Sequence, residues 1–586
     1  MIQIQSVRVS GFRGLSNIEV NLEKTTVLIG MNNAGKTSFL KALQIAFGDT
    51  RFVNEDDFYI DTSEIQVDDI IIDVLLIPLD DTGNRAAVLD RYWASVFRGS
   101  VQLDGDGNEY VAFRTKISRI DDQRRFYPQR VPIKEWVNFE SWKSGHHVGT
   151  TKMSSFSDSI SFLFQDAQRD ITEDLKLRTS PLGRVLSKVE YEPGDIAALQ
   201  ELIDELNQDA VDKSDVLTSL RTHLSELGDA IGTQTGKTEI TPFAKKIRDL
   251  TKGMRLNYGE GDNSFSMEYH GMGTRSWASL LVIRSYAKIL EAERRTNNKP
   301  FLAILALEEP EAHLHPNAQK QLYHQMSQFP GQVIISTHSP YVAAQANIGE
   351  LRSFYKTNNM TKIGAFNKSL APDSKRKIQR EIIERQGDIL FARIIVLQEG
   401  QTESQLLPRL IEACTDKSCF RMGVSTIQVG SYANYESFLA VASALNIPVI
   451  IYSDTDDDHV KQVVRNAVLA LYPALTGPSN DTVFMDEGNN LEKQLITEGF
   501  QQEVKESFVR YHSQINPDER YVQVLRNKYA AYSDDTLLAE MTQKKTIYSH
   551  FLGDIFIENP FNREESKRFP RSVVSLCRKI ETWKSQ

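Results

Sequence analysis

The sequence predicts an α/β protein built from two domains, and three observations lead to this prediction. The chain has 586 residues, which is enough for two to four folding units. Apolar, strand-like runs alternate with helical patterns in two separate stretches, residues 1–370 and 391–586. In each stretch a polar cluster directly follows an apolar run, where the strands of an α/β sheet open onto a ligand site. We therefore expect two α/β domains, the first with a helical insertion at about 192–240 and the second with a helical C-terminal region, joined by a linker at 371–390.

The composition is that of a globular chain in a reducing compartment. Hydrophobic residues make up 40% and charged residues 25% of the chain. The net charge of -10 argues against a protein that coats nucleic acid by bulk attraction, but a local basic groove would still bind it. The three cysteines are too few for a disulfide framework and form no zinc-binding set. Because the N-terminus lacks a signal-peptide block and no apolar run reaches the roughly 18 residues that span a bilayer, we expect a cytoplasmic protein without membrane contact.

The elements of the first domain follow from periodicity. Strand-like runs at 2–10 and 25–30 lead into a helical pattern, and the stretch from 65 to 135 is rich in strands. Within it, the DGDG at 104–107 is typical of a hairpin turn. Strand and helix signals alternate again through 300–355.

The insertion has a different pattern. Its leucine and isoleucine spacing predicts two amphipathic helices, near 195–208 and 213–228. Two interpretations stay open, because such a helical hairpin either packs on its own domain or forms a dimerisation arm.

The second half of the chain begins after a polar stretch that indicates a linker or a linking helix. A new α/β pattern opens at IIVLQEG, residues 394–400, and continues to about 515. The remaining chain is mainly helical and locally basic.

A phosphate-binding loop is the clearest motif of the first domain. Residues 30–37 read GMNNAGKT and match GxxxxGK[ST] between a strand and a helix. Backbone amides of such a loop face phosphate oxygens, and the helix N-terminus adds its positive end. Lys36 would reach the β- and γ-phosphates of ATP, and Thr37 would ligate Mg²⁺. The residues that we expect to bind the nucleotide in this loop are Gly30, Asn33, Gly35, Lys36, Thr37 and Ser38.

Acidic residues and a histidine supply the partners of this loop. The apolar run of FLAILALEEPEAHLHP delivers Glu308 and Glu309 side by side, and successive strand residues point to opposite faces. One carboxylate can therefore hold magnesium while the other orients the attacking water. His338 follows a further apolar run, where a γ-phosphate sensor is expected.

These motifs resemble the ABC-type ATPases of the recombination-repair and chromosome-maintenance group. The resemblance implies that Glu308 is the magnesium-side acid, Glu309 the catalytic glutamate and His338 the switch histidine. It also implies a signature loop at 270–281, with Gly273 and Ser276, which completes the nucleotide site of a second subunit and so predicts a homodimer or higher homo-oligomer. This loop departs from the LSGGQ consensus, and Glu308 stands where many relatives have aspartate. Two candidates remain for the glutamine that contacts magnesium, Gln165 and Gln168.

The second domain carries an acidic cluster of its own. Glu399 and Glu403 follow one apolar run, and Asp454 and Asp456 follow another. Four carboxylates gathered at the mouth of a sheet would repel one another unless a divalent cation held them. The cluster therefore predicts a metal site.

The glutamate after the first strand and the DxD after a later strand resemble the Toprim signature. An ATPase of this type followed by Toprim resembles the OLD (overcoming lysogenisation defect) family of nucleases. That resemblance implies two-metal hydrolysis of DNA with Mg²⁺, Mn²⁺ or another divalent cation. It adds Glu492 as a later metal ligand, Asp486 as an outside candidate, and Lys545, with Lys544 as the alternative, as the lysine beside the transferring phosphate. Asp457 and Asp458 only extend the negative field.

The function expected from this resemblance is that of an ATP-regulated, metal-dependent DNA endonuclease or nickase. Similar architectures occur in bacterial antiphage effectors of the Gabija and retron-associated types, which implies a helicase, or a reverse transcriptase with its DNA, as a possible partner. The basic tail and a set of cations after the DGDG turn are candidates for DNA contact: Arg114, Lys116, Arg119, Arg124 and Arg125.

Three other functions compete with the nuclease. A DNA-binding repair-type ATPase clamp would use a non-catalytic Toprim domain as a scaffold, but the filled set of acids argues against it. A Toprim topoisomerase would need a tyrosine nucleophile in a separate DNA-gate domain, for which the chain has no room. Primase activity would require nucleotide polymerisation, which an extension assay detects.

Overall fold

The chain divides into two compact units in the computed structural model. The first unit comprises Met1, Asp90–Val96 and Ser155–Val333, and the second comprises Ile2–Leu89, Phe97–Ser154 and Ile334–Gln586. The residues that the structure describes are 1–48, 52–61, 65–120, 125–153, 156, 158–167, 180, 193–220, 257–258, 265–366, 372–384, 387–430, 434–455, 459, 462 and 482–584.

An antiparallel sheet opens the second unit. Its strand order is β2-β1-β4-β6-β5, and β7 also pairs with β6. The DGDG prediction is confirmed, because β5 and β6 form an antiparallel hairpin and the Asp104 carboxylate accepts hydrogen bonds from the amides of Asp106 and Asn108. The strands are β1 (Ile2–Phe12), β2 (Leu15–Asn21), β4 (Asp69–Pro78), β5 (Val101–Leu103), β6 (Glu109–Ser118) and β7 (Gln129–Pro132).

The phosphate-binding loop belongs to a separate group of elements in the same unit. β3 (Thr25–Gly30) is buried along its whole length and leads through the loop into α1 (Lys36–Phe47). β3 pairs in parallel with β13 (Leu351–Thr357), which forms a hairpin with β14 (Met360–Ala365). The last three residues of β12 (Gln332–Ser336) and the short helix α10 (Pro340–Ala343) also belong to this unit.

The first unit contains the predicted insertion and the acidic motif. β8 and β11 pair in parallel, with Gln165 opposite Leu307. α5 (Pro193–Asp212) contains the first insertion helix expected from the sequence, and the second is described only as far as residue 220. α5 leaves Ile196, Leu202 and Leu206 exposed, and the dimerisation arm stays a prediction. The other elements are α2 (Arg91–Val96), β8 (Ile160–Gln165), β9 (Asn257–Tyr258), β10 (Phe265–Ser266), α8 (Met272–Thr296), β11 (Leu302–Glu308) and α9 (Pro316–Ser327).

The segment expected to be a linker or a linking helix is helical and packed. It forms α11 (Pro372–Lys377), a π-helical turn (Ile378–Ile383) and a 3-10 turn (Gly387–Phe391). Ile378, Ile382 and Ile383 are buried, so the apolar positions within the polar stretch anchor it.

A parallel four-stranded sheet follows, in the order β16-β15-β17-β18. β15 and β17 are buried along their whole length and almost entirely apolar, as expected when helices cover both faces of a parallel sheet. The chain leaves β15 toward β16 on one side and returns to β17 on the other, which makes the edge between β15 and β17 a topological switch point. The elements are β15 (Ile394–Gln398), α12 (Gln401–Thr415), α13 (Cys419–Met422), β16 (Val424–Gln428), α14 (Tyr435–Leu445), β17 (Val449–Ser453) and β18 (Thr482–Phe484).

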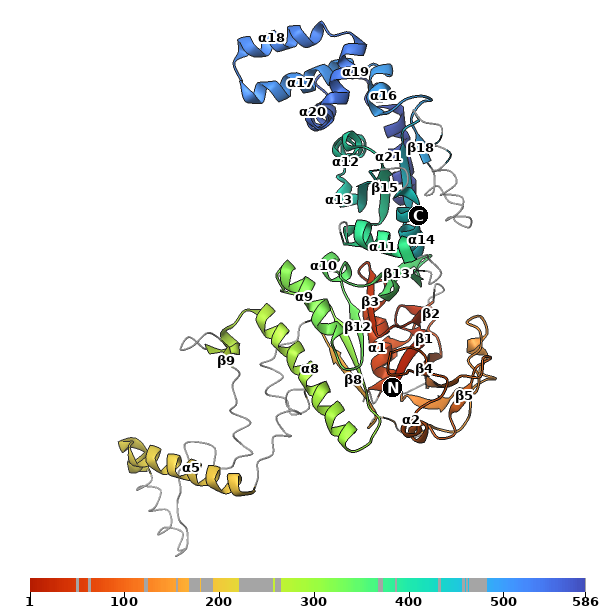
Figure 1. Ribbon diagram of the computed structural model, residues 1–586, viewed down its shortest axis with the longest axis vertical. Helices are drawn as coiled ribbons and strands as arrows, with labels where there is room; N and C mark the ends of the chain where they lie inside the picture. Colours follow the sequence, from red (N-terminus) through yellow and green to blue (C-terminus); the bar gives the residue numbers. More distant parts are fainter. Residues whose placement is uncertain are drawn as a thin grey trace, which may run out of the picture. The chain divides into compact units, whose positions relative to one another are not determined.

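The C-terminal region is helical, as predicted, and Figure 1 shows α17 to α20 gathered into one bundle. Its side chains share one apolar core with the parallel sheet, since Val396, Leu406, Tyr452, Phe508 and Tyr548 belong to the same buried cluster. The helices are α16 (Leu491–Thr497), α17 (Gln501–Ile515), α18 (Glu519–Ala530), α19 (Asp534–Gln543), α20 (Lys545–Glu558) and α21 (Arg571–Lys584).

The predicted fold class is therefore confirmed: an α/β chain with a first part that carries the phosphate-binding loop, a second α/β part and a helical C-terminal region. None of the helices in the described ranges is long and apolar enough to cross a membrane.

Candidate functional site

The phosphate-binding loop has backbone conformations that glycine and asparagine tolerate best. Gly30, Asn33 and Gly35 all have positive φ angles, of 137°, 63° and 107°. A Cβ atom at Gly30 would also overlap the carbonyl oxygen of Phe354 on β13. The strand can therefore turn into the loop only with glycine at this position.

Lys36 is held inside the loop. Its Nζ donates to the carbonyl oxygens of Gly30 (2.8 Å) and Met31 (3.1 Å), and the side chain is buried. Thr37 and Ser38 follow in the first turn of α1, exposed and half-buried. The loop thus presents a buried ammonium group and two hydroxyls at one helix N-terminus, which suits a nucleotide phosphate with its magnesium ion.

Thr361 on β14 braces the loop, a role that the sequence does not signal. Its hydroxyl donates to the carbonyl oxygens of Ala34 (3.1 Å) and Gly14 (3.2 Å). The β13–β14 hairpin therefore contacts the phosphate-binding loop directly.

The acidic motif lies in the first unit. β11 ends at Glu308, and Glu309 takes a left-handed conformation with φ of 44°, so the backbone turns sharply between the two carboxylates. Gln165 ends the neighbouring strand β8, and its buried Oε1 accepts no hydrogen bond from the described residues. Gln168, the other glutamine candidate, lies outside the described residues. His338 follows β12 and belongs to the second unit.

The expected signature loop is in fact the start of a helix. α8 begins at Met272 with Gly271 as its N-cap, so Gly273 and Ser276 lie within the first two turns rather than ahead of them. A Cβ atom at Gly273 would approach the carbonyl oxygen of His313 to 2.5 Å. Glycine therefore allows the helix to start close to the turn that follows β11.

The carboxylates of the second domain emerge at the switch point of the parallel sheet. Glu399 follows β15 and Asp454 follows β17, and the parallel register places Gln398 opposite Tyr452. Ser453 Oγ donates to Glu399 Oε1 over 3.3 Å, which ties the two strand ends together. Asp456, Asp457 and Asp458 lie outside the described residues.

Two buried glutamates lie behind this edge. Glu403, in the first turn of α12, is 4% exposed, and Glu492, in the first turn of α16, is 1% exposed. Burial and the neighbouring charge of Glu492 raise the pKa of Glu403 to about 7. Two acids in one apolar environment favour a shared cation, whether a metal ion or a lysine.

Glu492 lies beside the expected Lys545 and also accepts hydrogen bonds from two residues that the sequence did not indicate, Thr402 and Tyr548. Its Oε1 accepts from Thr402 Oγ1 (2.7 Å) and Tyr548 OH (3.4 Å) and lies 3.6 Å from Lys545 Nζ. Tyr548 follows Lys545 by three residues on α20, so both side chains lie on the same face of the helix. This spacing is the sequence feature that could have indicated Tyr548 as a neighbour of the site. Lys544 instead pairs with Glu540 over 2.7 Å. The geometry therefore favours Lys545 over Lys544 for the site.

The donor chemistry suits a divalent cation, since all the expected ligands are carboxylates. Within the described part of the chain, however, no group of three or more His, Cys, Asp or Glu side chains lies close enough together to hold a metal ion. One of the five expected ligands, Asp456, is not among these residues.

Most of the cations proposed for DNA contact are engaged elsewhere. Arg114 is buried and forms two hydrogen bonds of 2.7 Å with Asp73, so it does not reach the surface. Lys116 pairs with Asp69 over 2.9 Å, and Arg119 lies 3.6 Å from Asp68. Arg125 lies over the ring of Phe52, and Arg124 is not described.

A basic concavity lies elsewhere on the second unit. It has a volume of about 480 Å³, and its lining holds three cations but no carboxylate. Among the described residues, none of these cations forms an ion pair; they are Arg98, Lys134 and Lys152.

Comparison with known proteins gives two family matches. The AAA ATPase domain family matches residues 2–100 and 136–343. The TOPRIM domain of overcoming lysogenization defect protein-like sequences matches residues 390–456.

Individual relatives agree with these matches. The OLD nuclease of Thermus scotoductus is 25% identical over 485 residues, which cover 77% of this chain and 82% of that protein. Endonuclease GajA of Bacillus cereus is 20% identical over 482 residues, which cover 78% of this chain and 75% of that protein. Among solved structures, the C-terminal region of the Xanthomonas campestris OLD protein matches 33% of this chain and 95% of its own length, with 18% identity and a TM-score of 0.26.

Proposed function

Because the chain belongs to the AAA ATPase domain family and also carries an OLD-like Toprim domain, it is an ATP-dependent nuclease, and we propose that it cuts DNA by a two-metal mechanism. The observation that carries the proposal is the edge of the parallel sheet. There Glu399 and Asp454 emerge from neighbouring strands, with the buried pair Glu403 and Glu492 and the ammonium group of Lys545 in the same domain.

Each residue of the proposed metal site has its own proposed role. The five carboxylates Glu399, Glu403, Asp454, Asp456 and Glu492 would hold Mg²⁺ or Mn²⁺. When bound, such cations would supply Lewis acidity for the activation of water and the stabilisation of the leaving oxygen. Lys545 would place positive charge beside the transferring phosphate. Thr402 and Tyr548 hold Glu492 in position through its Oε1 atom.

A cavity within the second unit supports the proposal that the ATPase part controls cleavage. The cavity has a volume of about 510 Å³ and is lined by Met31 and Asn32 of the phosphate-binding loop and by Arg393 and Pro448. Arg393 immediately precedes β15, and Pro448 immediately precedes β17. Each strand is five residues long, and a carboxylate of the proposed metal site directly follows it. A displacement of the loop would therefore reach the strands that carry Glu399 and Asp454.

DNA contact is proposed at the basic concavity. Three cations that form no ion pair with any described residue, together with the hydroxyls of Thr150 and Thr151, suit the phosphates of a nucleic-acid backbone. The overall charge of -10 makes such a local basic surface necessary for DNA binding.

The wider setting is also a proposal. Gly273 and Ser276 near the start of α8 support a homodimer or larger homo-oligomer that forms through the ATPase part. The resemblance to antiphage effectors supports a cytoplasmic role in bacterial defence, with a helicase, or a reverse transcriptase with its DNA, as the partner.

Plasmid cleavage tests the function. Supercoiled plasmid is incubated with Mg²⁺ or Mn²⁺, with and without ATP, and with wild type, Asp454→Ala, Lys36→Ala or the control Glu487→Ala. Glu487 is an exposed acid on the turn before α16, so its removal tests charge loss alone. We expect Asp454→Ala to lose cleavage but keep ATP binding, and Lys36→Ala to lose ATP binding and nucleotide control.

Two outcomes would contradict the proposal. Full cleavage by Asp454→Ala would contradict the assignment of the metal site. The absence of cleavage by wild type with either metal, under every nucleotide condition, would favour the ATPase clamp with a non-catalytic Toprim scaffold.

A further inference from the structure

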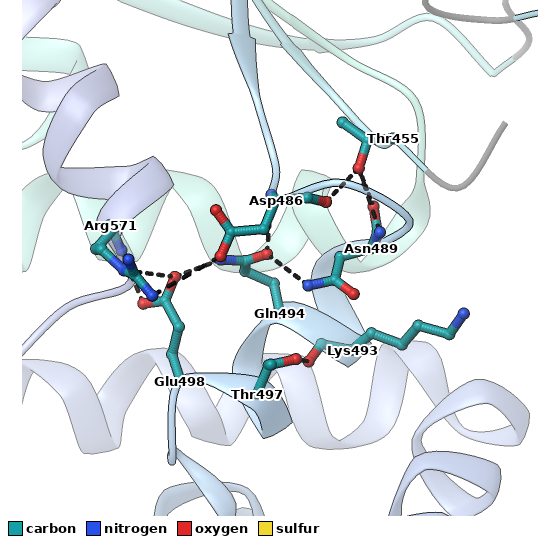
Figure 2. Close-up of polar contacts among 8 residues, drawn as sticks. All are labelled: Thr455, Asp486, Asn489, Lys493, Gln494, Thr497, Glu498 and Arg571. Carbon is teal, nitrogen blue, oxygen red and sulfur yellow. Dashed lines mark hydrogen bonds and ion pairs between the residues drawn. The ribbon is translucent and has the colours of Figure 1, made fainter. Parts of the chain in front are cut away.

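Thr455, between Asp454 and Asp456, connects the acidic loop to a turn far along the chain. Its amide donates to the carbonyl oxygen of Asn489 (2.9 Å), and the amide of Gly488 donates to the carbonyl oxygen of Thr455 (3.3 Å). The Thr455 hydroxyl bonds to the carbonyl oxygens of Asp486 and Asn489 (Figure 2). Backbone and side chain of Thr455 together therefore bind the chain just after β17 to the turn at 486–489.

This turn leads directly into the helix that carries Glu492. Asn490 caps α16, and its side chain accepts a hydrogen bond from the amide of Lys493 (3.0 Å). Glu492 is the second residue of the helix. The position of the turn therefore sets the position of Glu492 relative to Asp454.

One buried side chain fixes the turn to the helix. Gln494, which is 1% exposed, accepts through Oε1 from the amide of Asp486 (3.1 Å) and from Asn489 Nδ2 (3.0 Å). Its Nε2 donates to Asp486 Oδ2 (2.9 Å) and to Glu498 Oε1. Figure 2 shows this amide at the centre of the network. Only a side chain with an acceptor and a donor at this reach can make all four contacts.

α21 also contributes contacts to the hydrogen-bond network around Gln494. The backbone amide of Arg571 donates to Glu498 Oε2 (2.9 Å), and its guanidinium group lies 3.8 Å from Asp486 Oδ2. The Asp486 carboxylate is therefore engaged by protein donors, which argues against its use as a metal ligand.

We propose that Thr455 and Gln494 are positioning residues that preset the spacing between Asp454 and Glu492 and thereby increase the affinity for divalent cations. The proposal rests on the proposed nuclease function. Groups behind metal ligands that orient them typically change metal affinity by about 10- to 100-fold when removed.

Four variants test the proposal in the full-length protein. Thr455→Val and Gln494→Met keep the side-chain volume and remove the hydrogen bonds, whereas Thr455→Ser restores the hydroxyl. Thr497→Val is the matched control, because among the described residues the Thr497 hydroxyl bonds only to the carbonyl oxygen of Lys493 on its own helix. Mn²⁺ binding is measured by titration calorimetry, cleavage is measured against Mn²⁺ concentration, and thermal unfolding is recorded for each variant.

We expect Thr455→Val and Gln494→Met to weaken Mn²⁺ binding by about 10-fold or more and to raise the Mn²⁺ concentration for half-maximal cleavage by the same factor. Thr455→Ser and Thr497→Val should stay within about twofold of wild type.

Wild-type Mn²⁺ affinity in folded Thr455→Val would overturn the proposal, and so would equal weakening in Thr497→Val. Should Gln494→Met fail to fold, the pair Thr455→Val and Thr455→Ser decides alone. Asp454→Ala distinguishes failure of the positioning role from failure of the proposed nuclease function. If this variant binds Mn²⁺ as well as wild type, the proposed function itself fails. If only Asp454→Ala loses Mn²⁺ binding, the positioning role fails and the function stands.

Discussion

At the scale of single residues, burial and close approach restrict which side chains the proposed metal site tolerates. Gly400 caps α12 with ordinary backbone angles, so conformational freedom does not explain it. Instead, the Glu403 carboxylate lies close to the backbone of Gly400, and a Cβ atom on Gly400 would overlap Glu403 Oε2. Glycine at this position therefore leaves the space that the Glu403 carboxylate occupies.

Gly400→Ala should consequently displace Glu403 and lower metal-dependent cleavage, with little change in thermal unfolding. The same substitution at Gly349, where a Cβ atom would meet nothing within 4 Å, is the control. Cleavage assays at saturating Mn²⁺ and thermal melts of both variants check this expectation. Equal activity in the two variants would show that Glu403 needs no such space.

The neighbouring lysines Lys544 and Lys545 are expected to differ in their effect on the cleavage rate. Lys545→Met should lower the cleavage rate on the order of 100-fold at saturating metal, because the charge beside the phosphate is lost. Lys544→Met removes only the pair with Glu540 and should keep nearly the full rate. Single-turnover cleavage by both variants measures the difference, and a larger loss in Lys544→Met would reverse the assignment.

At the scale of elements, the β13–β14 hairpin connects the two proposed sites of the second unit. Thr361 on β14 bonds to the phosphate-binding loop, while Gly364 on the same strand packs against the end of α14. A Cβ atom at Gly364 would lie 2.6 Å from the carbonyl oxygen of Ala444. α14 is followed directly by β17, the strand that ends at Asp454.

Gly364→Ala should therefore push the hairpin away from α14 and weaken the ATP dependence of cleavage. ATP binding should stay unchanged, because the phosphate-binding loop itself is intact. Cleavage with and without ATP, compared with nucleotide binding by fluorescence titration, tests this. Undiminished control by ATP in Gly364→Ala would exclude the hairpin as the connection, and Gly349→Ala again serves as the control.

At the scale of the whole molecule, charge distribution decides where a polyanion can bind. The chain is acidic overall, and Arg114, Lys116 and Arg119 are occupied by neighbouring carboxylates. The concavity that contains Arg98, Lys134 and Lys152 has cations without such neighbours among the residues that line it. Its electrostatic potential is therefore not cancelled locally.

The double variant Lys134→Glu/Lys152→Glu should weaken DNA binding and reduce the slope of log affinity against log salt by about 0.9 for each lost phosphate contact. The matched double variant Lys116→Glu/Lys213→Glu makes the same change in net charge at paired lysines elsewhere. Fluorescence anisotropy over a range of salt concentrations measures both. An equal loss in the two variants would attribute binding to net charge and not to the concavity.

Local patterns were sufficient for much of the fold. The apolar runs before Gly30, Glu399 and Asp454 are all buried strands, because a strand covered on both faces must be continuously apolar. The DGDG turn and the first insertion helix likewise follow from local chemistry. The polar stretch before residue 391 was expected to be a linker or a linking helix; it is helical, and its three buried isoleucines are a packing detail that its polar composition does not indicate.

The sequence by itself determined the kinds of chemistry that this chain carries: a phosphate-binding loop and carboxylates at the ends of buried strands. Only the tertiary structure decided which side chains share a site. Thr402 and Glu492 are 90 residues apart in the chain yet 2.7 Å apart in space, and Arg114, which looked like a surface cation, is buried against Asp73. The physical reason is that the hydrophobic periodicity of a segment shows only which of its faces is buried and which is exposed. Contacts between distant elements depend on how the whole core packs, which no single segment encodes.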